Sequence, residues 1–79
     1  MKYVVLITDE GETPIIFPER LFHDEIANAV ENREVVSAGF VRLSGSKIEC
    51  YGESLGLELS SREEADASLI QHHMTTEEV

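Results

Sequence analysis

Apolar and polar residues alternate most regularly between residues 35 and 59, and this stretch carries the strongest structural pattern in the chain. Residues 35–43 are rich in β-branched and aromatic side chains, which favour strands. Gly45 follows within a segment of small residues and can adopt the positive φ that a tight turn needs. Alternation then resumes, so the pattern predicts a hairpin with strands over 34–43 and 47–52.

A change of phase follows this hairpin. Ile48 and Cys50 occupy even positions, whereas the next apolar residues, Leu55, Leu57 and Leu59, occupy odd positions. One strand cannot change phase and keep a single buried face. We therefore expect a bulge or bend near Gly52 and a separate strand over 55–59.

The first part of the chain predicts two strands and a helix. Residues 2–8 form a nearly continuous apolar run, as in strands at the centre of a sheet. Residues 14–17 begin with a proline, which cannot donate a ladder hydrogen bond, so we expect an edge strand there. Apolar residues then recur every four positions at Phe22, Ile26 and Val30, which predicts a helix over 22–31.

A second helix is predicted over 62–73. Ser60 or Ser61, followed three residues later by a glutamate, has the spacing of a capping box. Arg62 and Asp66 have the spacing of an i,i+4 ion pair. We expect residues 1–74 to form a single α+β domain of ββα-ββ(β)α order, and 75–79 to be a frayed tail. The expected architecture is a small twisted antiparallel sheet of four to five strands with both helices on one face.

Charge and composition limit the classes of partner. The 79 residues include 16 acids and 6 Lys or Arg, giving a formal net charge of −10. This balance argues against direct binding of nucleic acid or an anionic membrane, and it favours a basic host protein as a possible partner. No apolar run approaches the roughly 20 residues of a membrane span. A single cysteine cannot form an internal disulfide, which fits a reducing cytoplasm.

The residues able to carry chemistry have simpler structural explanations. Cys50 lies in phase with Ile48 among glutamates that would raise its pKa, so we expect a buried and unreactive thiol. His72 and His73 are adjacent, and on a helix they point about 100° apart, which does not suit one metal ion. The segment 23–25, His-Asp-Glu, is expected to cap a helix rather than transfer protons. We predict no catalytic residue, cofactor or metal site.

The candidate interface is Val36, Phe40 and Tyr51. These residues are expected on the sheet face opposite Val35, Val41 and Leu43, a face that two helices on one side would leave bare. Because large exposed apolar surfaces are unusual in monomers, we expect a homodimer, held by the sheet or by the second helix, that covers it. The unpaired edge of a short sheet gives a second route to a dimer. The alternative is that Phe40 and Tyr51 simply pack as an isolated cross-strand pair.

Three segments, S-A-G-F-V at 37–41, C-Y-G-E-S-L-G-L at 50–57 and S-R-E-E-A-D at 61–66, resemble a pattern in short uncharacterised proteins encoded by bacteriophages and prophages. They consist of packing and turn residues, and no activity is known for that group. The resemblance implies a small accessory protein. We therefore expect a non-enzymatic protein that acts by protein binding or self-association. The alternative is an acidic inhibitor that mimics nucleic acid at the basic site of a host enzyme.

Overall fold

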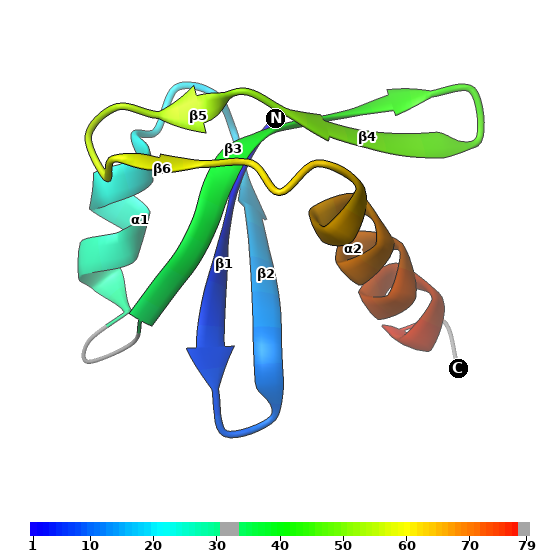
Figure 1. Ribbon diagram of the computed structural model, residues 1–79, viewed down its shortest axis with the longest axis horizontal. Helices are drawn as coiled ribbons and strands as arrows, with labels where there is room; N and C mark the ends of the chain where they lie inside the picture. The colour runs from blue at the N-terminus through cyan, green and yellow to red at the C-terminus, as the bar shows by residue number, and fades with distance from the viewer. Residues whose placement is uncertain (31–33, 78–79) are drawn as a thin grey trace.

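The computed structural model describes residues 1–30 and 34–77, with side chains as far as Met74. A four-stranded antiparallel sheet of order β2–β1–β3–β4 forms its centre (Figure 1). Its strands are β1 (Lys2–Thr8), β2 (Gly11–Phe17), β3 (Glu34–Ser44) and β4 (Lys47–Tyr51). Two helices, α1 (His23–Ala29) and α2 (Glu64–Glu77), and a short pair of strands, β5 (Glu53–Ser54) and β6 (Leu59–Ser60), complete the fold. The predicted α+β class and antiparallel sheet are confirmed.

Strand β1 is the core of the molecule. Residues Tyr3 to Leu6 are almost completely buried, and β1 pairs with β2 on one side and β3 on the other. This confirms the prediction of a central strand. Strand β2 lies at the edge, where Pro14 pairs in register with Val5, so the edge prediction is also confirmed.

The prediction that both helices cover one face is wrong. Tyr3 and Val5 pack with Ile70 of α2, whereas Val4 and Leu6 belong to a second cluster with Ile26 of α1. Successive side chains of a strand point to opposite faces, so α1 and α2 lie on opposite sides of the sheet (Figure 1). The physical reason is that β1 is apolar on both faces, and each face needs its own cover.

The hairpin between β3 and β4 closes as predicted. Gly45 has a φ of +66° in its turn, and the chain leaves the sheet at Gly52, where φ is +78°. The predicted strand over 55–59 is wrong, because residues 55–58 form a turn that joins β5 to β6. The Glu58 N–H donates to the Leu55 carbonyl across this turn, and Glu58 has a φ of +56°.

The helix boundaries differ from the predicted ones at both ends. Helix α1 is shorter than predicted, and residue 31 lies outside the described residues. Helix α2 starts at Glu64 and continues to Glu77, into the segment predicted as a tail; residues 78–79 lie outside the described part. Two side chains accept backbone N–H groups at the start of α2. The Ser61 hydroxyl accepts the Glu63 N–H, and the Asp66 carboxylate accepts the Arg62 N–H.

Candidate functional site

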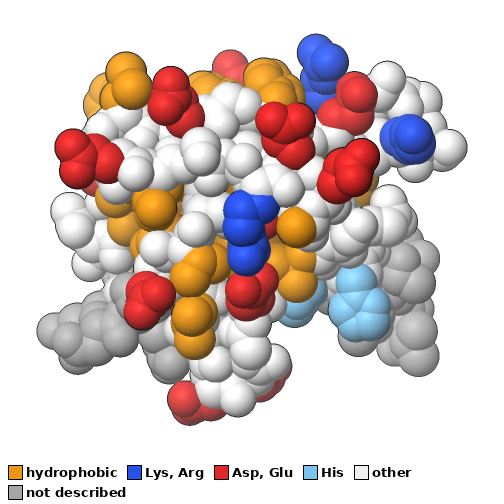
Figure 2. Space-filling view, viewed as in Figure 1, with side chains coloured by type: hydrophobic (Ala, Val, Ile, Leu, Met, Phe, Trp, Pro, Cys, Tyr) orange, Lys and Arg blue, Asp and Glu red, His pale blue; other side chains and the backbone are white. Residues whose placement is uncertain are grey.

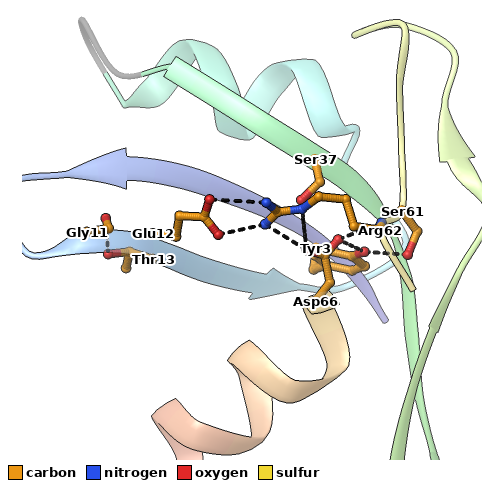
Figure 3. Close-up of polar contacts among 8 residues, drawn as sticks. All are labelled: Tyr3, Gly11, Glu12, Thr13, Ser37, Ser61, Arg62 and Asp66. Carbon is orange, nitrogen blue, oxygen red and sulfur yellow. Dashed lines mark hydrogen bonds and ion pairs between the residues drawn. The ribbon is translucent and has the colours of Figure 1, made fainter. Parts of the chain in front are cut away.

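The most polar buried cluster surrounds Asp66, whose side chain is fully buried at the start of α2 (Figure 3). Its carboxylate accepts hydrogen bonds from the Tyr3 hydroxyl at 2.5 Å and the Ser37 hydroxyl at 3.1 Å. It also accepts the backbone N–H and the side-chain Nε–H of Arg62, each at 2.9 Å. The cluster therefore joins α2 to β1 and β3.

Arg62 extends this cluster to the edge strand β2. Its two terminal nitrogens donate to both carboxylate oxygens of Glu12, at 2.8 and 3.1 Å, in a bidentate pair (Figure 3). Its Nη2 also lies 2.9 Å from Asp66 Oδ1, so the predicted ion pair between Arg62 and Asp66 is confirmed. One guanidinium thus connects two carboxylates from opposite ends of the chain.

The environment shifts the pKa values of the cluster in opposite directions. Burial alone would raise the pKa of Asp66, but hydrogen bonds from Tyr3, the Arg62 N–H and Ser37, with the Arg62 charge, hold it below its ordinary value. Burial and then the bond to Asp66 raise the pKa of Tyr3 well above its ordinary value. Asp66 is therefore a carboxylate and Tyr3 a neutral phenol at neutral pH.

The acceptor positions of the Asp66 carboxylate are filled. A carboxylate offers about four acceptor positions, and four donors already occupy those of Asp66. In the part of the chain that the structure describes, every buried side-chain nitrogen and oxygen has a hydrogen-bond partner. We conclude that these residues fasten α2 to the sheet.

His23 also has a structural role. Its ring is buried, and Nε2 lies 2.8 Å from the Gly39 carbonyl oxygen. The ring packs edge-on against Phe17 and Phe40, with centroids 5.5 and 5.8 Å apart. Glu25 accepts the Phe22 N–H at 2.9 Å, which is the capping role predicted for this segment.

The remaining candidates lie apart from one another. Cys50 is buried in the cluster with Tyr3 and Val5, and burial raises the pKa of its thiol to about 11. The His72 and His73 rings meet edge-to-face, with centroids 6.1 Å apart. Among the described residues, no three His, Cys, Asp or Glu side chains gather closely enough to hold a metal ion.

The structure separates the three residues of the predicted interface. Phe40 and Tyr51 stack across β3 and β4 with centroids 5.7 Å apart, on the α1 side of the sheet. Val36 instead packs against the Tyr3 cluster on the α2 side. The cause is an irregularity in the β1–β3 register beside Val36, which changes the phase of β3.

Phe40 and Tyr51 belong to a group of surface side chains that we call the apolar patch: Phe22, Phe40, Tyr51 and Leu55. Phe40 is half-buried, and the other three are exposed. Phe22, the residue that caps α1, is 64% exposed, Tyr51 is 41% exposed and Leu55 is 81% exposed. Phe22, Phe40 and Leu55 line one shallow hollow, whose rim carries Lys2, Asp24 and Glu53.

The sequence did not reveal Phe22 and Leu55 as members of this patch. The apolar spacing of Phe22 predicts a place in the buried stripe of the helix, but its position before the first helical turn leaves it outside the core. Leu55 fits a strand by its spacing, yet it lies in the turn between β5 and β6. Two features of the sequence could have indicated irregular backbone here: Pro18, which lies shortly before Phe22, and Gly52 and Gly56, which lie on either side of Leu55.

A second hollow runs between β4 and α2. Five consecutive residues, Ser46 to Cys50, line one wall. The other wall consists of residues from the start and middle of α2: Glu63, Glu64, Ala67, Ser68, Gln71 and His72. Because neighbouring residues of β4 point to opposite faces, a hollow lined by all five follows the open edge of that strand. We call it the edge groove.

No protein-family model, curated protein or solved structure matches the chain. Within the described residues, neither helix has the length and hydrophobicity needed to cross a bilayer. The described residues thus form two surface hollows, one lined by the apolar patch and one being the edge groove, and a buried polar cluster around Asp66.

Proposed function

We propose that this chain is a small non-enzymatic accessory protein that acts by protein binding, and that it associates as a homodimer through the apolar patch. The observation that supports the proposal is the exposure of Phe22 and Leu55 at one hollow, with the exposed Tyr51 stacked on Phe40, which also lines that hollow. Their burial against a partner is favourable by about 1.5–3 kcal/mol for each large apolar side chain. Aromatic anchors of this kind dominate the affinity of many interfaces.

The surface proposed to form the dimer differs from the bare sheet face that the sequence suggested. Each face of the sheet packs against one helix, so the sheet has no face opposite both helices. The patch supplies the apolar surface instead, and its rim carries charges of both signs. Lys2 of one subunit can therefore meet Asp24 or Glu53 of the other when the two patches face each other across a two-fold axis.

Acidity opposes this association over longer distances. Each chain carries a formal charge of −10, and acidic side chains outnumber basic ones over the face in Figure 2. At 0.1 M ionic strength, salt largely screens the repulsion between exposed charges that lie more than about 10 Å apart. The dimer should therefore become tighter as salt is added, unlike a complex with a basic protein.

The acidic inhibitor of a nucleic-acid enzyme remains the alternative function. Its competition with DNA for a basic enzyme would weaken with salt. A cytoplasmic site of action and a phage or prophage origin also remain predictions, which the sequence resemblance and the single cysteine support.

Paired variants test the dimer. Phe22→Ser with Leu55→Ser removes the two most exposed members of the patch, and light scattering during size exclusion should show a monomer at micromolar concentration. Leu43→Ser is the matched control, because Leu43 is 63% exposed but lies near the β3–β4 turn. The control should remain a dimer. Equal masses for both variants, with unchanged circular dichroism, would contradict the proposal.

A further inference from the structure

We propose that the edge groove receives an extended segment of a partner protein that carries lysine or arginine at alternate positions, and that this segment pairs with β4 as a fifth strand of the sheet. The inference rests on the proposed function, since it assumes a protein that binds other proteins. It adds a second surface, a mode of binding and a chemical class of partner.

The two edges of the sheet are protected differently. Thr8 and Gly11 flank a two-residue turn and form the first hydrogen-bonded pair of the β1–β2 ladder. Hydrogen-bonded and non-hydrogen-bonded pairs alternate from there, so Pro14, opposite Val5, has its backbone nitrogen directed away from β1. Proline has no N–H, so the row of outward groups along β2 is interrupted. Edge strands often carry proline for this reason, because it prevents pairing with another chain.

Strand β4 has no such interruption. The Val41 N–H donates to the Met1 carbonyl at 2.9 Å, which places the N–H of Val41 on the β1 side of β3. Val41 pairs in register with Cys50, so the main-chain groups of Cys50 and, two residues earlier, Ile48 point away from β3. In the described chain, no strand pairs with this outer edge.

The groove beside this edge suits a strand in both shape and chemistry. It extends along all five residues from Ser46 to Cys50, and Ile48 and Ala67 supply apolar contacts from its two walls. An added strand would gain main-chain hydrogen bonds from β4, and its alternate side chains would point towards α2.

Charge decides the class of partner. Glu63 and Glu64 lie on the α2 wall, and both are exposed. The β4 wall carries Lys47 and Glu49, and Arg42 already binds Glu49 at 3.1 Å. Basic side chains that point towards α2 would meet Glu63 and Glu64. A second copy of this chain fits less well, because Lys47 is the basic side chain that a second β4 strand would offer to Glu63 and Glu64.

Three short peptides test the proposal by NMR titration of the full chain. The probe is a peptide of about eight residues in which lysine and valine alternate, long enough to span β4. One control carries methyl groups on the backbone nitrogens of its valines, which removes donors and keeps the charge. The other control has glutamate in place of lysine. We expect the first peptide alone to shift the amide signals of Ser46–Cys50 and of the first turns of α2.

Variants of the chain separate strand addition from general attraction. Glu63→Gln with Glu64→Gln should weaken the lysine peptide by about tenfold, whereas Glu10→Gln in the β1–β2 turn should leave binding nearly unchanged. Ile48→Pro removes one outward N–H and should also weaken binding. Absence of binding by the lysine peptide, equal binding of its methylated form, or equal effects of the Glu10 and Glu63 variants would each overturn the inference. Measuring the mass in the same samples separates a failure of strand addition from a failure of the dimer. A dimer that does not bind the peptide contradicts only the strand addition. A monomer that binds the peptide contradicts only the dimer.

Discussion

The Tyr3 hydroxyl donates a hydrogen bond to the Asp66 carboxylate across 63 residues of sequence, which joins the first strand to the last helix. Both groups are buried, and Ser37 and Arg62 complete the shell around the carboxylate. This contact fixes α2 on the sheet, and it thereby forms the α2 wall of the edge groove. The stability of the fold and the geometry of the proposed binding surface thus depend on one buried acid.

Asp66→Asn should lower the free energy of unfolding by about 3 kcal/mol. The substitution leaves the Tyr3 and Arg62 donors without their charged acceptor in a buried site, which is more costly than losing an exposed pair. Urea unfolding measures the change. Glu64→Gln is the control, since its exposed side chain should change stability by less than about 0.5 kcal/mol. Similar losses for the two variants would contradict the role given to Asp66.

The same residue should make the fold sensitive to acid. Because the folded state holds the pKa of Asp66 below its ordinary value of 3.8, the unfolded chain binds more protons when the pH falls below that value. The contribution of Asp66 is therefore complete above pH 3.8 and is lost as the pH falls through the folded pKa. The stability difference between the natural chain and Asp66→Asn should shrink over this range. A difference that stays constant down to about pH 3 would show that ionisation of Asp66 is not responsible.

Gly39→Ala should destabilise the fold by about 2–3 kcal/mol through overpacking. A Cβ atom at Gly39 would lie 2.5 Å from the Tyr51 carbonyl oxygen and 3.1 Å from the Ser61 Cβ, where the chain leading to α2 crosses the sheet. Gly56→Ala is the matched control, because its new Cβ would lie no closer than 3.7 Å to Asp24. Thermal unfolding should shift for the first variant and hardly change for the second. Unchanged thermal unfolding of both variants would contradict the close packing described at Gly39.

Cys50 should resist alkylation in the folded protein. Burial raises the pKa of the thiol from 9.0 to about 11, which lowers the thiolate fraction near neutral pH about a hundredfold. Iodoacetamide labelling followed by mass spectrometry compares the folded chain with the chain in urea. Rapid labelling of the folded form would contradict the buried position of Cys50.

Local patterns predicted the four strands of the main sheet well, but they predicted the segment 53–60 and the arrangement of the helices badly. The apolar run of β1, the proline in β2 and the glycine between β3 and β4 each have a direct physical consequence, so these elements follow from the sequence. Periodicity also gives the apolar side of each helix, but it does not give the sheet face on which that side packs. Since β1 is buried on both faces, either face was available to α2.

The candidate surfaces were harder to predict because they depend on irregular backbone. Phe40 and Tyr51 were found through cross-strand alternation, and Val36 was misplaced by a register irregularity that leaves no clear trace in the sequence. Leu55 has the spacing of a strand, yet the turn that contains Glu58 at positive φ exposes it. Predicting the edge groove would have required knowing that α2 lies beside β4, which only the tertiary structure shows.

Sedimentation equilibrium of the natural chain at micromolar concentration, at low and at high salt, tests the proposed protein binding most directly. We expect a mass of twice 8.8 kDa, with tighter association at high salt because screening reduces the repulsion between chains of charge −10. A single species of 8.8 kDa at both salt concentrations would contradict it.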